Sequence, residues 1–301
     1  MPRDGESAAS RACLAMDFYL LSGAGNDFIA LVAPPAIPSP EAVRAWCRRG
    51  ISVGADGVFV LSPTAGGARM RHWNADGGRG ALCLNGSRCA AQLAFHLGWQ
   101  EERLDLVTDA GTLAARRLDE TRVEIALPPI VGRPQARRLD AAGRRVSGFY
   151  LRVGVPHLVV PWDGDLGAAP LDRLGPILRA HPELGPGGAN VDLVRFEPPH
   201  RLAIRTYERG VEAETLACGT GVVAAAATGL LCRGMTGPLA ARTAGGFVLT
   251  VTGRPGSGRI GLVDATLAGD ARLLARGTLL SGASVGPAGA AAAERPAHQR
   301  R

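Results

Sequence analysis

Two cysteines, Cys83 and Cys218, stand at equivalent places in a stretch of sequence that occurs twice. The first copy covers residues 73 to 98 and the second covers residues 207 to 234. Each copy has an aromatic strand end, a polar loop, a cysteine, a glycine-containing turn and a helix of small residues that ends at glycine. This repeat predicts two pseudo-symmetric halves whose thiols face a shared cleft.

The turns that follow Cys83 and Cys218 predict what these thiols can do. Each turn begins a helix, and we expect its unpaired amides and positive dipole end to lower the thiol pKa toward neutrality. The same amides form a site for a carboxylate. Two thiols on opposite faces of a planar carbon are what a two-base inversion requires, with one thiolate removing a proton and the other thiol returning one. Preorganised amides would then stabilise the charge on the substrate carboxylate.

The other cysteines have contexts typical of structural residues. Six cysteines in a chain without a recognisable secretion signal indicate free thiols. Cys13 lies in a segment expected to be disordered, whereas Cys47, Cys89 and Cys232 lie in helical stretches and are expected to be small buried hydrophobic residues. No Cys/His ligand spacing occurs, so no metal is expected. A Cys-His hydrolase that uses His157 is an alternative, but it needs only one cysteine.

All 34 basic residues of the Lys+Arg class are arginine, because the sequence contains no lysine. This excludes a Schiff base to pyridoxal phosphate and the lysine of a P-loop nucleotidase. The net charge of +7, with eight arginines between Arg116 and Arg145, raises an arginine-rich nucleic-acid-binding module as an alternative. The stretch lacks interleaved aromatic residues, so we expect no nucleic-acid partner.

The hydrophobic pattern predicts no membrane segment, since no uncharged apolar run approaches 18 residues. Charged residues interrupt the first 16 residues, which therefore do not resemble a signal peptide. We expect a cytoplasmic protein that neither spans nor binds a membrane.

Short apolar runs separated by turn residues predict curved, mostly antiparallel sheets. A short helix is expected over residues 40 to 49. The expected strands cover 17 to 33 as two strands around a glycine loop, then 56–61, 69–73, 104–107, 111–118, 122–127, 149–154, 157–162, 190–196, 201–207, 247–251 and 259–263.

Composition predicts where the chain passes between the halves. Residues 128 to 148 are rich in proline, arginine and glycine and are expected to be the crossing, whereas residues 270 to 280 are expected to return to the first half as a closing strand. The predicted domains are 17–130 plus 268–282, and 131–267. Residues 1–16 and 283–301 are expected to be a disordered head and tail.

Eight motifs, in order along residues 17 to 282, show that the sequence resembles the diaminopimelate epimerase family. They are GAGNDF (23–28), GADG (54–57), WNADG (73–77), CLNGSRC (83–89), GVPH (154–157), ANV (189–191), YERG (207–210) and ETLACGTG (214–221). The resemblance implies an α/β fold of the α+β type, with two pseudo-symmetric domains that each wrap a curved, mostly antiparallel sheet around a central helix. It also implies a cofactor-independent epimerase, a homodimer, that interconverts LL- and meso-diaminopimelate for lysine and peptidoglycan synthesis.

The same resemblance assigns roles to individual residues. Cys83 and Cys218 match the catalytic acid and base, and His157 and Glu208 match neighbours that set thiol protonation. The positions that match substrate-binding residues of the family are Asn26, Asn74, Asn85, Gly86, Asn190, Glu208, Arg209, Gly219 and Thr220.

Two positions depart from the family pattern. Leu84 stands where the family usually has glycine, and Val155 stands where a GNPH motif has asparagine. A glycine-to-leucine change can alter the turn that binds the carboxylate, and the loss of asparagine removes a polar contact to the distal end of the substrate. A racemase or epimerase of the same fold that acts on another amino acid is therefore the alternative.

Overall fold

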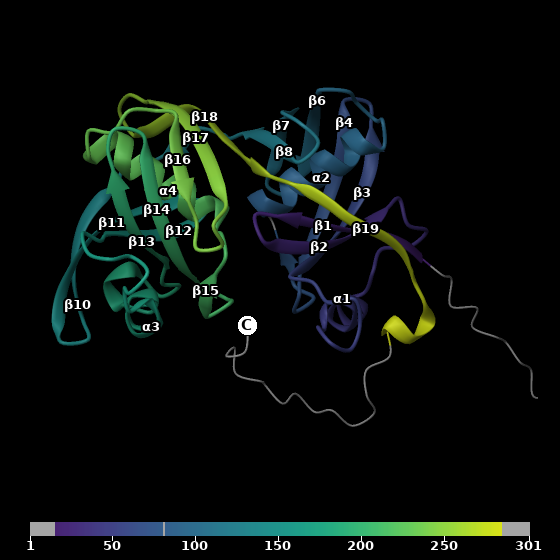
Figure 1. The fold of residues 1–301 in the computed structure, drawn as a ribbon, viewed down its shortest axis with the longest axis horizontal. Helices are drawn as coiled ribbons and strands as arrows, with labels where there is room; N and C mark the ends of the chain where they lie inside the picture. The colour runs from purple at the N-terminus through teal and green to yellow at the C-terminus, as the bar shows by residue number, and fades with distance from the viewer. Residues whose placement is uncertain (1–15, 81, 285–301) are drawn as a thin grey trace, which may run out of the picture.

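The computed structural model describes residues 16–80 and 82–284, which form two similar halves side by side (Figure 1). The first half contains β1 (Met16–Gly23), β2 (Asn26–Val32), α1 (Pro40–Cys47), β3 (Gly57–Thr64), β4 (Gly67–Asn74), β5 (Arg79–Gly80), α2 (Leu84–His96), β6 (Arg103–Thr108), β7 (Gly111–Arg117) and β8 (Arg122–Ala126). The second half contains β9 (Ile130–Val131), β10 (Gln135–Ala141), β11 (Arg144–Val153), β12 (Val155–Pro161), α3 (Leu171–Arg179), β13 (Asn190–Glu197), β14 (Arg201–Glu208), β15 (Ala213–Thr215), α4 (Gly219–Cys232), β16 (Leu239–Arg242), β17 (Val248–Pro255) and β18 (Ile260–Asp270). Two short 3₁₀ helices, Pro182–Leu184 and Ser281–Ser284, and strand β19 (Arg272–Leu279) complete the description.

The two halves have the same strand pairing. In the first, the neighbours run β19-β1-β2-β3-β4-β6-β7-β8, and the pairs β2/β3 and β4/β6 are parallel. In the second, they run β10-β11-β12-β13-β14-β16-β17-β18, and the corresponding pairs β12/β13 and β14/β16 are parallel. Every other pairing between described strands is antiparallel. The structure therefore confirms the predicted α/β class with mostly antiparallel sheets.

A buried helix lies inside each curved sheet, α2 in the first half and α4 in the second (Figure 1). Every residue of α2 from Leu84 to Phe95 is buried. Its alanines, like the four consecutive alanines Ala224 to Ala227 of α4, are fully buried and allow strands to approach the helix from several sides. Removing this apolar surface from water stabilises each half.

Strand pairing joins the two halves of the molecule. Strands β8 and β18 are antiparallel neighbours, so the sheets of the two halves are continuous there. Beyond β18, the chain returns as β19, which pairs with β1. The segment expected to close the first half does form this strand.

Three expectations about the elements are corrected. Residues 128 to 148 are not a plain connection, because β10 and β11 form a hairpin whose alternate residues Leu139, Ala141 and Val146 are buried. The arginines that dominate this stretch lie mainly on the exposed side of the strands, which hides the alternation. Helix α3 and strand β16 were not predicted. Helix α3 contains an internal proline, a residue that usually ends helices.

The ends of the chain lie largely outside the described residues, and so do most of the expected disordered head and tail. Met16 begins β1, and the last short helix extends to Ser284, so ordered structure reaches slightly beyond both expected limits. No helix among residues 16–80 and 82–284 is long and apolar enough to cross a membrane.

Candidate functional site

The first turns of α2 and α4 meet at the junction of the two halves. A Cβ atom built on Gly219 would lie 3.0 Å from Cβ of Leu84 and 3.3 Å from Oδ1 of Asn85. Asn85 also donates a hydrogen bond of 3.0 Å to the carbonyl oxygen of Ala217. Because Leu84 follows Cys83 and Gly219 follows Cys218, these contacts bring the two cysteines, one from each half, to the same junction.

Both cysteines are the residues that precede their helices. Cys83 has extended backbone angles (φ −132°, ψ 107°), and its Sγ accepts a hydrogen bond of 3.4 Å from the amide of Gly86. Cys218 has similar angles (φ −111°, ψ 109°). A capping residue satisfies an amide that the first turn of a helix leaves unpaired. The amide of Gly86, expected to contact the substrate carboxylate, therefore contacts the Cys83 thiol in this structure.

The expectation that both thiols have lowered pKa values is wrong for this conformation. Burial raises the pKa of Cys83, and it raises that of Cys218 well above the usual value. The nearby carboxylate of Glu208 raises both further, whereas the helix-start amides and the Thr220 hydroxyl lower them by less. Burial disfavours the charged thiolate more strongly than the amides favour it. Both thiols are therefore held in the neutral form.

Glu208, at the end of β14, is an ionisable residue whose charge raises the pKa of both thiols. Thr215 donates a hydrogen bond of 2.5 Å to its carboxylate. Burial raises the pKa of Glu208, an effect that its hydrogen bonds and the nearby His157 partly offset. A carboxyl group with a raised pKa can exchange a proton with a thiol at lower cost than an ordinary carboxylate.

A chain of polar contacts leads from Cys218 into the second half. Sγ of Cys218 lies 3.4 Å from Oγ1 of Thr220, which lies 3.0 Å from Nε2 of His157. Nδ1 of His157 lies 2.8 Å from the buried carboxylate of Asp192, which also accepts a hydrogen bond of 2.8 Å from Thr206. The chain accommodates two proton arrangements: a neutral thiol with a neutral imidazole, or a thiolate with an imidazolium that the Asp192 carboxylate stabilises.

Gly221 allows Asp192 to lie this close to α4. A Cβ atom at position 221 would be 2.5 Å from Oδ1 of Asp192, so the Asp192 carboxylate would have to move away from its contacts with Thr206 and His157. The glycine of the GTG turn is thus required by packing as well as by the turn itself.

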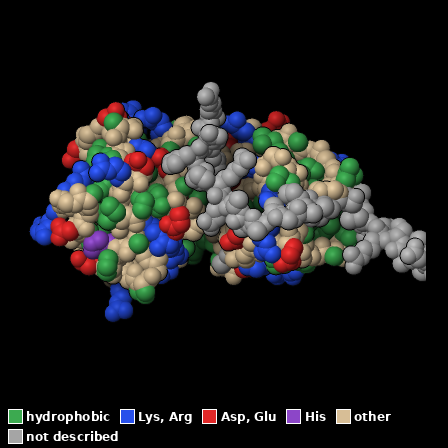
Figure 2. Space-filling model, turned by 90° about the horizontal axis from the view of Figure 1, so that it is seen from below, with side chains coloured by type: hydrophobic (Ala, Val, Ile, Leu, Met, Phe, Trp, Pro, Cys, Tyr) green, Lys and Arg blue, Asp and Glu red, His purple; other side chains and the backbone are tan. Residues whose placement is uncertain are grey.

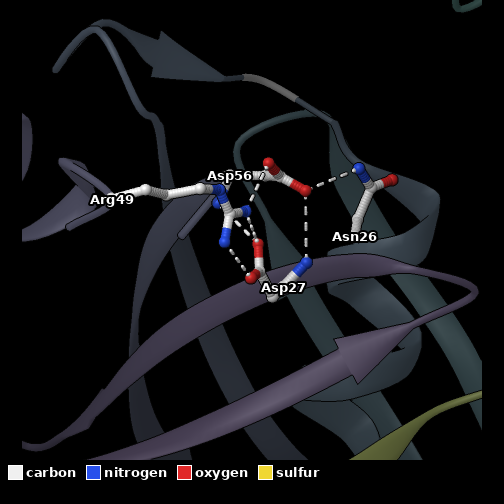
Figure 3. Close-up of polar contacts among 4 residues, drawn as sticks. All are labelled: Asn26, Asp27, Arg49 and Asp56. Atoms are coloured by element: carbon white, nitrogen blue, oxygen red, sulfur yellow. Dashed lines mark hydrogen bonds and ion pairs between the residues drawn. The ribbon is translucent and has the colours of Figure 1, made fainter. Parts of the chain in front are cut away.

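A second polar network fixes the orientation of Asn26 and, through it, of Asn85. Figure 3 shows the part of this network around Asn26. Arg49 donates to both carboxylates of Asp27 and Asp56, and Asp56 accepts a hydrogen bond of 3.1 Å from Nδ2 of Asn26. Oδ1 of Asn26 is left to accept from Nδ2 of Asn85 at 2.6 Å. The two amides therefore have one consistent assignment of donor and acceptor.

Arg88 completes this network from inside α2. It is fully buried, and it donates to Oδ1 of Asn85 at 2.7 Å and to the carbonyl of Asp270 at 3.2 Å. A buried guanidinium with these partners holds the Asn85 side chain and the end of β18 together.

The remaining predicted site residues lie farther along the same elements. Asn190 is buried and accepts a hydrogen bond of 2.8 Å from the amide of Arg209, whose guanidinium donates to the carbonyl of Gly187 at 3.2 Å. Asn74 is the exposed last residue of β4, and its backbone bonds to Gly77 and Gly78 in the turn that follows. The contacts of these residues do not by themselves join them to the thiols.

The structure adds residues that the sequence did not single out. Arg49, Asp27 and Asp56 support Asn26, Asp192 supports His157, and Arg88 supports Asn85. Asp27, Asp56 and Arg88 lie within the motifs GAGNDF, GADG and CLNGSRC. Their place in these motifs is the sequence feature that could have identified them as site residues. Two structural cysteine expectations hold, since Cys47 and Cys89 are buried. Cys232 is exposed, because it closes α4 at its surface end, and the expectation that it is buried is wrong.

Known proteins resemble this chain in sequence and in fold. The family model described as diaminopimelate epimerase matches residues 18–127 and 149–261. A protein of Aquifex aeolicus named diaminopimelate epimerase is 34% identical, over 78% of this chain and 89% of its own. One of Gemmatimonas aurantiaca with the same name is 40% identical, over 70% of this chain and 78% of its own. A solved structure of a probable proline racemase from Agrobacterium radiobacter, 17% identical, has the same fold, with a TM-score of 0.68 over 88% of this chain and 93% of its own.

Proposed function

Because the chain belongs to the diaminopimelate epimerase family, we propose that it interconverts LL- and meso-diaminopimelate, with Cys83 and Cys218 as the two bases. The observation that carries this proposal is the contact between Leu84 and Gly219, the residues next to the two cysteines, across the junction of the halves. The reaction supplies precursors of lysine and peptidoglycan. It needs no cofactor, because thiols and amides provide the proton transfer and the charge stabilisation.

The mechanism requires the two thiols to differ in protonation state at the moment of reaction. The base loses its proton when substrate binds, and the substrate ammonium and the helix-start amides favour the resulting negative charge. The thiolate then takes the α-proton, and the opposite thiol gives its proton to the other face of the carbon. His157, through Thr220, and Glu208 set which thiol carries the proton.

The positions proposed to bind substrate lie around the thiols. Asn26 is held by the network of Figure 3, and Asn85 is held by its hydrogen bond to Asn26. The amides of Gly86, Gly219 and Thr220 belong to the helix starts. Asn74, Asn190, Glu208 and Arg209 are proposed to bind the rest of the substrate from the ends of β4, β13 and β14.

The test measures exchange of the substrate α-proton. The purified protein should exchange the α-proton of LL-diaminopimelate with deuterium in heavy water and form the meso isomer. Cys83→Ser and Cys218→Ser should each reduce turnover by about 10² to 10⁴, whereas Cys232→Ser should not. Full turnover in either active-site variant would refute the two-thiol mechanism.

A racemase for another amino acid is the second candidate, because Leu84 is buried against Gly219 where the family usually has glycine. The Leu84 side chain occupies space between the first turns of α2 and α4 that a glycine would leave open. Faster inversion of a monocarboxylate amino acid than of diaminopimelate, in a panel assayed at equal concentrations, would favour this candidate.

We further propose two domains, 17–130 plus 268–282 and 131–267, a homodimer and a cytoplasmic location without nucleic-acid partners. The pairing of β19 with β1 supports the domain division. Several arginines of the basic stretch pair with acids, including Arg116 with Glu124 at 2.8 Å and Arg145 with Asp140 at 3.3 Å. Arginine and acidic side chains are interspersed on the face drawn in Figure 2, which supports the absence of a nucleic-acid partner.

A further inference from the structure

A small cavity lies beside Cys83, on the side of β4 and the turn between β6 and β7. His72, Ser87 and Cys83 line it from inside, and Thr108 and Asp109 line it toward the surface. Its volume for a water-sized molecule is about 10 Å³, which is close to the space that one water occupies. Asp109 is exposed and forms an ion pair with Arg79 at this edge.

Two polar atoms that belong to residues of this cavity have no hydrogen-bond partner among the residues that the structure describes. They are Nδ1 of His72 and Oγ of Ser87. His72 is 7% exposed and Ser87 is fully buried. Buried polar atoms of native proteins are nearly always paired with protein or with ordered water, because an unpaired one destabilises the fold. Two such atoms on residues that line a space of this size point to a bound molecule that can donate and accept hydrogen bonds.

We propose that this cavity holds one ordered water, bound by His72 and Ser87, through which the thiol of Cys83 exchanges its proton with solvent. The water has three polar neighbours, the His72 ring nitrogen, the Ser87 hydroxyl and the Cys83 sulfur, a number typical of buried water. Burial and the charge of Arg79 lower the pKa of His72 to about 4. The ring is therefore neutral at physiological pH and offers an acceptor or a donor without adding charge beside the thiol.

This role rests on the proposed two-thiol reaction, which leaves the protons of the enzyme interchanged. After one turnover, the former base carries a proton and the former acid has lost one. Before the same isomer can react again, both thiols must exchange protons with solvent. At Cys83, the thiol proton moves to the water oxygen while one proton of that water leaves toward bulk solvent past Thr108 and Asp109. The water remains neutral, and Cys83 becomes a thiolate.

The experiment measures how long an abstracted deuteron stays on each thiol. One isomer of diaminopimelate carries deuterium at the reacting carbon, the other carries ¹⁵N, and both react together in ordinary water. The thiol that takes deuterium from the first isomer is the acid for the second. Deuterium therefore appears in ¹⁵N-marked product only when that thiol has not exchanged with water, and mass spectrometry measures the captured fraction. Moving the deuterium to the other isomer reports on the other thiol.

Ser87→Ala and His72→Phe each remove one hydrogen-bond partner of the water and should slow exchange at Cys83 about fivefold. The captured fraction of deuterium should therefore rise in the labelling scheme that reports on Cys83. It should stay unchanged in the scheme that reports on Cys218. Thr228→Val is the matched control, since it removes a buried hydroxyl that donates to Ala224 in α4, outside this cavity.

Each outcome has one meaning. A rise in one scheme for both variants supports the proposal, and so does a crystal structure with a water within hydrogen-bond distance of Nδ1 of His72 and Oγ of Ser87. No rise, an equal rise in both schemes, or an equal rise in Thr228→Val overturns it. Absence of any α-proton exchange by the unaltered protein would instead refute the proposed function.

Discussion

The hydroxyl of Thr220 lies 3.0 Å from Nε2 of His157, and it connects that ring to the thiol of Cys218 at 3.4 Å. A hydroxyl has one proton and two lone pairs, so it can pass a proton between its two neighbours by donating to one while accepting from the other. This single side chain therefore couples the protonation of His157 to that of Cys218.

Removal of this hydroxyl should uncouple the two groups without altering the shape of the site. Thr220→Val is expected to lower kcat about 10²-fold, the contribution typical of one positioned proton-transfer group. KM should change little, because the backbone amide at position 220 remains.

Thr220→Ser is the control for this experiment, since it keeps the hydroxyl and should retain most of the activity. Equal losses in the serine and valine variants would show that the methyl group, rather than the hydroxyl, matters.

The contact between Gly219 and Leu84 predicts a stability effect that depends on both residues. A Cβ atom at position 219 would lie 3.0 Å from Cβ of Leu84, and α2 holds that atom in place. Gly219→Ala should lower the free energy of unfolding by about 1–3 kcal/mol, as overpacking usually does. In a Leu84→Gly background, Gly219→Ala should lower the free energy of unfolding by much less. Denaturant unfolding of the four proteins measures the coupling.

Gly66→Ala is the matched control for overpacking, since its new Cβ atom would lie 3.6 Å from the nearest atom, an ordinary contact. Additive effects of Gly219→Ala and Leu84→Gly would mean that the two positions do not contact each other.

The raised pKa values of the thiols predict the order of their alkylation. Cys232 is exposed, Cys83 is partly buried and Cys218 is buried with the larger upward shift of pKa, so iodoacetamide should modify them in that order. Below pH about 8.5, the usual thiol pKa, Cys83 and Cys218 should react slowly without substrate. Their rates should rise as pH increases beyond that value, and mass spectrometry of the digested protein measures each site.

These two thiols also affect folding in a defined direction. Because their pKa values are raised in the folded state, their neutral forms favour folding below the unfolded thiol pKa, and this contribution decreases as pH rises toward the folded values. In urea-unfolded protein, the three sites should react at similar rates. Faster alkylation of Cys218 than of Cys232 in the folded protein would contradict the burial of Cys218.

The sequence predicted the features that local patterns encode. The duplicated cysteine, turn and small-residue helix placed α2 and α4 correctly, and alternating apolar residues placed most strands. The hairpin of β10 and β11 was missed because arginines and prolines hide its alternation. The thiol pKa values were predicted in the wrong direction, since helix starts are visible in sequence but burial by the opposite half is not. The bond from Arg49 to Asp56 likewise depends on how α1 packs beside β3.

The network of Arg49, Asp27 and Asp56 predicts a pH-dependent contribution to stability. Burial raises the pKa of Asp27, but the hydrogen bonds and charge of Arg49 outweigh it, and the net shift is downward. A carboxyl with a depressed folded pKa stabilises the protein above its unfolded pKa, near 3.9, and this stabilisation is lost as pH falls through the folded value. Arg49→Met should therefore lower the free energy of unfolding at pH 7 by about 1 kcal/mol. The difference from the unaltered protein should shrink as pH falls below about 4, where Asp27 is protonated first in the unfolded chain and then, at lower pH, in the folded protein. Arg48→Met, a change at the exposed neighbouring arginine, should show neither effect, and a pH-independent difference for Arg49→Met would mean that Asp27 does not respond to Arg49.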